Sequence, residues 1–173
     1  MLVELVSTLA LGFGAAGIVL LLNRLLGRRL PRWSLPAAIA FSVIGYQVWL
    51  DYSWFGRTAA ALPEGMEVTV AVDEPAPWRP WSYFFPQIVR FAAIDAGGAR
   101  RHEGQPDLRI ADLYLFQRRG PAVTVPQLYD CGHGRRADLG DGVAFGPDGA
   151  PQGAVWTDLA PDDAALRALC PTP

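Results

Sequence analysis

The chain has 173 residues and a formal net charge of −2, with 17 acidic residues against 15 arginines and no lysine. This length allows one ordinary domain once any membrane segment is subtracted. We expect no nucleic-acid partner, and we interpret the lack of lysine as the composition bias of a GC-rich bacterial genome rather than as a functional feature.

An uncharged run near the N-terminus, residues 5–22, predicts a membrane-spanning helix. As a helix it would rise about 27 Å at about 1.5 Å per residue, which is close to the hydrocarbon thickness of a bilayer. One face of this helix is small, which favours close packing against another helix. The small residues are Gly12, Gly14, Ala16 and Gly17.

A second apolar run, residues 35–50, predicts another span, and its Gln47 has the chemistry to hydrogen-bond across helices. Trp33 stands at one end, and aromatic residues at the other end complete a belt typical of a membrane interface. These residues are Trp49, Tyr52, Trp54 and Phe55. We expect two spans, at about residues 4–23 and 34–52.

The resulting transmembrane hairpin, residues 1–55, has a predicted orientation. Its basic residues all lie in the connection between the two spans: Arg24, Arg28, Arg29 and Arg32. The positive-inside rule places this connection in the cytoplasm, so we expect a multi-pass protein of the bacterial inner membrane with both termini in the periplasm. A cleaved signal peptide fits less well, because the N-terminus carries Glu4 where a signal peptide has basic residues.

The rest of the chain predicts a juxtamembrane linker, residues 56–65, and an exported domain, residues 66–173. Residues 51–173 hold sixteen acidic residues and eleven arginines, a net charge of −5, against +3 for residues 1–50. The exported part of about 110 residues is near the usual domain size. We expect it to be mainly β, in the α+β class, with a short C-terminal helix.

Alternation of apolar and polar residues predicts the first strand of this domain at residues 66–73. Further strands are expected at residues 87–95, 107–119 and 122–130, the last weakened by Pro126, with a glycine-rich loop at residues 96–106. Residues 132–153 are rich in turn formers, with short strands expected at residues 143–145 and 154–159.

The C-terminal helix is expected to begin with Pro161, Asp162 and Asp163, because acidic residues in a first turn oppose the helix dipole. A modest core is expected from apolar residues of the strands. The candidates are Leu113, Leu115, Phe145 and Trp156.

Two cysteines, Cys131 and Cys170, lie in the exported part, where an oxidising compartment favours a disulfide. The bond would close a loop of about 40 residues, worth on the order of 3–4 kcal/mol in the chain-entropy model. Spacing alone does not prove the pairing.

The segment PAPWRPWSYFFPQIVRF, residues 75–91, is the strongest anomaly. Its prolines prevent a regular amphipathic helix, so we expect an extended stretch with turns. The rings either lie at the lipid headgroups, bind a partner membrane protein, or pack within the protein itself, where they fill the domain's own core or cover its transmembrane roots. The candidate contact residues are Trp78, Arg79, Trp81, Tyr83, Phe84 and Phe85.

Patterns that indicate chemistry are weak. Asp130, Cys131 and His133 lie within four residues, but this spacing is not that of a zinc site, and Cys131 would be lost to a disulfide. Acidic residues between glycines faintly suggest calcium but lack the EF-hand spacing. They are Asp138, Asp141 and Asp148.

We expect no catalytic residues, no metal site and no cofactor. After the second predicted span only Ser53 and Ser82 remain as serine nucleophiles, and neither lies in a nucleophile elbow. The sequence favours a non-enzymatic accessory or assembly subunit of a larger membrane complex, in contact with the bilayer and without an evident small-molecule substrate. The alternative is a membrane-anchored sensing or ligand-binding domain for a lipid or another apolar molecule.

Overall fold

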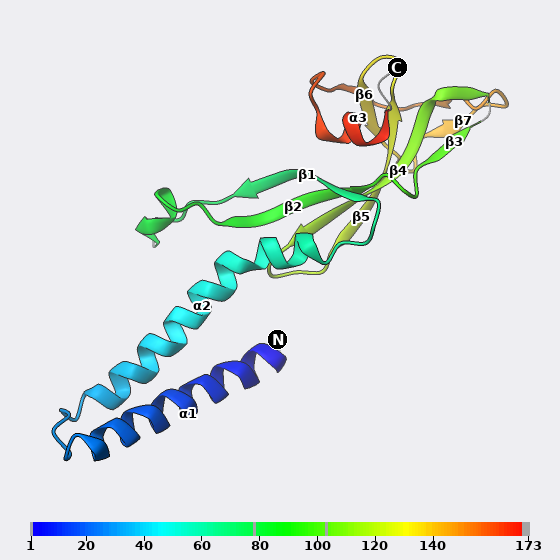
Figure 1. Ribbon diagram of the computed structural model, residues 1–173. Coiled ribbons are helices and arrows are strands. Elements are labelled where there is room, and N and C mark those ends of the chain that lie inside the picture. Colours follow the sequence, from blue (N-terminus) through cyan, green and yellow to red (C-terminus); the bar gives the residue numbers. More distant parts are fainter. Residues whose placement is uncertain (1, 78, 103, 171–173) are drawn as a thin grey trace. The chain divides into compact units, whose positions relative to one another are not determined.

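The computed structural model describes residues 2–77, 79–102 and 104–170 (Figure 1). The chain divides into two compact units, Met1–Trp54 and Phe55–Pro173. Helix α2, Ser34–Ala60, contributes residues to both units. Residues 56–60, which we expected in a linker, are therefore helical.

Helix α1, Leu2–Leu25, carries apolar side chains on all sides and buries none of its residues. Its 24 residues have a mean hydropathy of 2.3 in their most apolar stretch. Of the helices in the described part of the chain, α1 alone is long and apolar enough to cross a membrane, a criterion that signal sequences also meet. In α2 the apolar run is interrupted by Ser42, Gln47 and Asp51, so this finding supports one of the two predicted spans.

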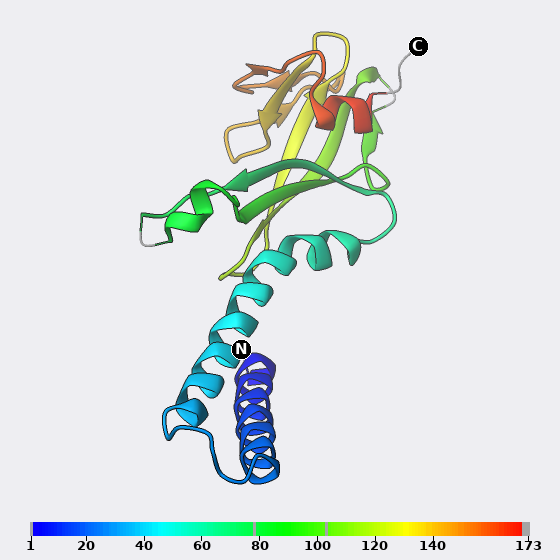
Figure 2. The ribbon, with the colours of Figure 1, turned by 60° about the vertical axis from the view of Figure 1, so that its left-hand side comes forward.

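Within the first unit, α1 and the first part of α2 lie side by side (Figures 1 and 2). The predicted polar contact is present, because Gln47 Nε2 donates to Thr8 Oγ1 over 3.4 Å. A Cβ added at Gly12 would lie 3.8 Å from a side chain of α2, whereas Gly14 and Gly17 face open space. The small face of α1 thus meets α2 only in part.

The second unit is a curled antiparallel sheet with helices, an α+β arrangement. The main strands are β1 (Met66–Asp73), β2 (Ile88–Asp95), β3 (Arg100–His102), β4 (Gln105–Gln117), β5 (Val123–Asp130), β6 (Arg135–Asp138) and β9 (Thr157–Asp158). They are ordered β1-β2-β4-β5-β6-β9, and β3 pairs with β4. A separate hairpin joins β7 (Ala144–Phe145) to β8 (Pro151–Gln152).

The four strands expected between residues 66 and 130 are present as β1, β2, β4 and β5. Three strands were not expected. The predicted glycine-rich loop contains β3, and β6 and β8 lie in the predicted turn-rich stretch. β3 and β6 are short and arginine-rich, and each exists because a long neighbouring strand offers it hydrogen bonds, which local periodicity does not reveal.

Pro126 lies inside β5 without breaking it. Its carbonyl accepts from Leu139 N, just past the end of β6. In a strand the N and O of one residue point to the same side, so the missing N–H of Pro126 faces this side, where β6 has already ended. The pairing of β5 with β4 is therefore unaffected.

The core lies between the sheet and helix α3, Ala164–Leu169. Its buried members are Ile94, Ala111, Leu113, Tyr129, Ala165, Leu166 and Leu169. Of the residues expected in the core, only Leu113 belongs to it. Phe145 and Leu115 are exposed, and Trp156 is half-buried under the guanidinium of Arg135, 4.5 Å from its ring centroid.

Helix α3 begins one turn later than expected, because Asp163 is its N-cap. The carboxylate of Asp163 accepts from Ala165 N and Leu166 N, which satisfies two free donors of the first turn. The predicted disulfide between Cys131 and Cys170 is confirmed, with a Cα–Cα distance of 5.6 Å, and it ties the end of α3 to the turn after β5.

Candidate interaction site

The predicted aromatic segment forms the connection between β1 and β2. These strands pair antiparallel, and the short 3-10 helix η1, Pro80–Tyr83, lies between them. Pro80 occupies its first turn, where a missing N–H costs no hydrogen bond. We call residues 79–86 the aromatic turn. Because the aromatic turn connects two paired strands, its two ends are held together by backbone hydrogen bonds.

Buried polar side chains hold the aromatic turn from inside. Ser82 is buried, and its hydroxyl accepts from Ala76 N over 2.9 Å and donates to Arg79 O over 2.6 Å. Gln87 is also buried, and its Oε1 accepts from Arg79 Nη1 over 2.7 Å. Because these groups are out of water, breaking the bonds would leave buried polar atoms unsatisfied. The turn is therefore pre-organised.

Four rings on this turn face solvent. Their exposed fractions are 46% for Trp81, 60% for Tyr83, 82% for Phe84 and 68% for Phe85. Phe91, five residues past the turn, is 2% exposed and stacks on Phe116 with ring centroids 4.7 Å apart. The hypothesis that the rings fill the domain's own core is therefore wrong for these four and holds for Phe91.

Two of the predicted contact residues, Trp78 and Arg79, are not among these four exposed rings. Trp78 lies outside the described residues. Arg79 is half-buried, and its guanidinium supports the turn by donating to Gln87. Acidic Asp73 and Glu74 are exposed at the base of the turn.

Sequence reasoning missed two further apolar residues beside this turn. Val70 and Val72 of β1 are exposed, although alternation predicted them on a buried face. A register shift between Val68 and Val70 interrupts the pairing with β2, and past it every residue of β1 is exposed. Proximity to the proline-rich connection was the only signal that this half of the strand leaves the core.

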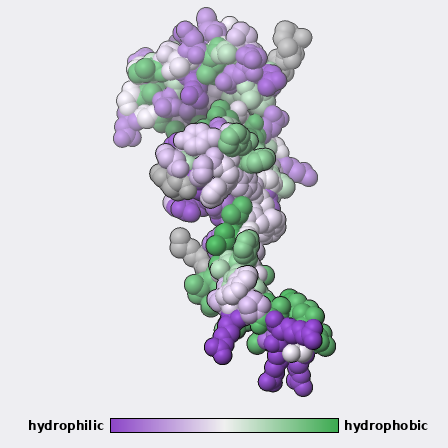
Figure 3. Space-filling model, turned by 90° about the vertical axis from the view of Figure 1, so that its left-hand side faces the viewer, coloured by the Kyte–Doolittle hydropathy of each residue, from purple (hydrophilic) through white to green (hydrophobic). Residues whose placement is uncertain are grey.

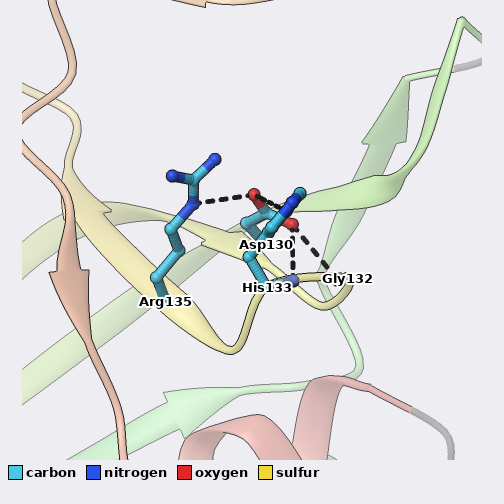
Figure 4. Close-up of polar contacts among 4 residues, drawn as sticks. All are labelled: Asp130, Gly132, His133 and Arg135. Atoms are coloured by element: carbon cyan, nitrogen blue, oxygen red, sulfur yellow. Dashed lines mark hydrogen bonds and ion pairs between the residues drawn. The ribbon is translucent and has the colours of Figure 1, made fainter.

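The second candidate cluster centres on Asp130 (Figure 4). Its carboxylate accepts from His133 Nδ1 and Arg135 Nε, each over 2.9 Å, and from the backbone N–H of Gly132 and His133. Burial alone raises the pKa of Asp130, but the hydrogen bonds from Arg135 and His133 outweigh it and lower the pKa. This cluster shapes the turn between β5 and β6.

Several of the residues considered as metal ligands are engaged in other contacts. Cys131 is in the disulfide, so its thiolate is not available to zinc. Asp138 accepts from Gln127 Nε2, and Asp148 accepts from Ala150 N within the β7–β8 turn. In the described ranges, no group of three or more His, Cys, Asp or Glu residues is arranged to hold a metal ion.

A shallow groove of about 360 Å³ lies at the β6–β9 edge. Its lining includes Arg136, Asp138 and Thr157, together with glycines. It is open to solvent and partly charged, unlike the enclosed apolar cavity that a lipid-binding domain requires.

No family model, curated protein or solved structure matches this chain.

Proposed function

We propose that this protein is a non-enzymatic subunit of the bacterial inner membrane that helps to assemble or support a larger membrane complex. The observation that carries the proposal is the aromatic turn, where four exposed rings stand on a backbone fixed by buried Ser82 and Gln87. A pre-organised aromatic surface binds with little loss of conformational entropy.

The membrane anchor is supported by the first unit. Since α1 buries none of its residues, its apolar surface needs lipid or another cover. We propose that α2 is a second span, because it also exposes large apolar residues, among them Phe41, Ile44 and Trp49. The α1–α2 connection is the hydrophilic end of the first unit (Figure 3), and its arginines favour the cytoplasm, with both termini in the periplasm.

A protein partner is favoured over lipid as the occupant of the aromatic turn. Residues 51–173 carry a net charge of −5, and Asp73 and Glu74 lie at the base of the turn, so anionic lipid would repel this surface. Arg79 is already engaged by Gln87. Tryptophan, tyrosine and phenylalanine are the residues that protein interfaces enrich in their cores.

The test is the variant Trp81→Ala with Phe84→Ala in the tagged full-length chain. Both side chains are exposed, so the fold should persist while partner recovery from native membranes falls at least about tenfold. The measurement is gentle-detergent affinity purification followed by native mass spectrometry.

The matched control removes two exposed apolar side chains elsewhere, Phe145→Ala with Val155→Ala, and should leave recovery unchanged. Equal recovery from the Trp81 and Phe84 variant would contradict the proposal. Binding of that surface to vesicles, with no stoichiometric protein partner, would assign the turn to lipid instead.

A further inference from the structure

One row of side chains crosses the sheet from β3 to β6. Arg101 pairs with Arg109, Arg109 with Tyr129, and Tyr129 with Arg136. Directly opposed residues in antiparallel strands share a face, with neighbouring strands about 5 Å apart. Three arginines therefore share one face with Tyr129, which lies between Arg109 and Arg136, and Arg101 lies on the other side of Arg109.

Arg109 is the unusual member of this row, because it is only 7% exposed. Its Nε is inaccessible to solvent and has no hydrogen-bond partner. Within the described part of the chain, the ion pairs do not include Arg109, Arg101 or Arg136. A guanidinium keeps its charge even when burial disfavours it, and buried charges are normally paired.

Among the residues that the structure describes, no ion pair balances this charge. Burial lowers the pKa of Arg109, Arg101 lowers it further, and Asp107 opposes them without forming an ion pair. Burial raises the pKa of Tyr129 to about 12, so its phenol stays neutral and donates to Gln127 Oε1.

The two other carboxylates that act on Tyr129 are already committed. Asp163 caps α3 through the backbone N–H of Ala165 and Leu166. Asp138 accepts from Gln127 Nε2 over 2.6 Å. Neither forms an ion pair with the arginine row.

We propose that Arg101 and Arg109 form a binding site for a phosphate-class oxyanion on this face of the β3–β4 hairpin. Arg109 supplies a buried, unpartnered donor, and Arg101 supplies an exposed guanidinium directly across the strands. Two adjacent guanidinium forks match the geometry and the double charge of a phosphate group. The phosphate belongs either to a soluble compound or to a lipid headgroup.

The experiment follows the arginine Nε–Hε signals of the full-length, ¹⁵N-labelled chain in neutral detergent during titration with inorganic phosphate. We expect a saturable shift of the Arg109 signal. Arg101→Gln should weaken phosphate binding at least about tenfold, because one charged fork is lost. Arg119→Gln removes an exposed arginine from a turn outside the row and should change nothing. Equal weakening by both variants, or a shift that never saturates, would overturn the proposal.

Two further arms complete the test. Arg109→Lys keeps the charge but loses the fork, so it should fold and still bind phosphate more weakly. Nanodiscs with phosphatidylglycerol, compared with phosphatidylcholine alone, identify the lipid source if they shift Arg109 when free phosphate does not.

Discussion

Asp130 holds the turn between β5 and β6 with a single buried carboxylate. It accepts from two side chains and two backbone donors, and the net effect of these hydrogen bonds is a pKa below the ordinary value. A carboxylate with a depressed folded-state pKa contributes stability above its unfolded pKa and loses that contribution as the pH falls through the folded value. The turn should therefore be weakened by acid.

The variant Asp130→Asn should lower the free energy of unfolding by about 1–3 kcal/mol at about pH 7, because buried donors lose a charged acceptor. The difference from wild type should shrink below about pH 4, where the wild-type carboxylate also becomes protonated. The measurement is urea unfolding of the detergent-solubilised chain, followed by circular dichroism at several pH values. Asp141→Asn is the control, since Asp141 is exposed. An equal effect of the two variants would contradict this role.

At the scale of elements, α3 is a helix of only six residues and depends on its attachments. Isolated helices of this length are not stable in water. Three of its residues, Ala165, Leu166 and Leu169, are buried in the core, and the disulfide fastens its C-terminal end to the turn after β5. We therefore expect loss of the disulfide to destabilise α3 before it destabilises the rest of the second unit.

Replacing both cysteines, Cys131→Ser with Cys170→Ser, should reduce stability by about 4 kcal/mol, because the bond spans 39 residues of the unfolded chain. The check is the urea midpoint of the variant against wild type with and without reductant. Wild type under reductant should match the variant. An unchanged midpoint in a chain shown by mass to be reduced would contradict a stabilising role.

At the scale of the whole molecule, the proposed topology places α1 and α2 across the membrane and the second unit in the periplasm. An impermeant maleimide tests it with single cysteines added to the chain, whose native pair is in a disulfide. Ala160→Cys should be labelled in intact spheroplasts, and Leu30→Cys only after lysis, because Leu30 lies in the arginine-rich connection.

Other labelling patterns have direct meanings. Labelling of Leu30→Cys in intact spheroplasts would contradict a cytoplasmic connection. Protection of Ala160→Cys would mean that α1 alone crosses the membrane, with the second unit inside the cell. A mature chain that lacks α1 by mass would identify it as a cleaved signal sequence.

The sequence by itself determined the features that depend on neighbouring residues. The uncharged run of α1 predicts an apolar helix, and the structure buries none of its residues. Period-two alternation located β1, and strand-like runs between turn signals located β2, β4 and β5. Two cysteines in the part expected to be exported favoured a disulfide, and the structure confirms the bond. These are properties of composition and local periodicity, which do not require knowledge of distant contacts.

Only the tertiary structure decided which residues are covered. The rings of Trp81 and Phe84 share a segment with Phe91, yet the first two are exposed and Phe91 is buried against Phe116, which is distant in sequence. Arg109 became a candidate binding residue because β3 and β5 bring Arg101 and Tyr129 beside it, and β6 adds Arg136 on the far side of Tyr129. Burial and charge balance are set by strand pairing across the sheet, and pairing over such separations leaves no local pattern in the sequence.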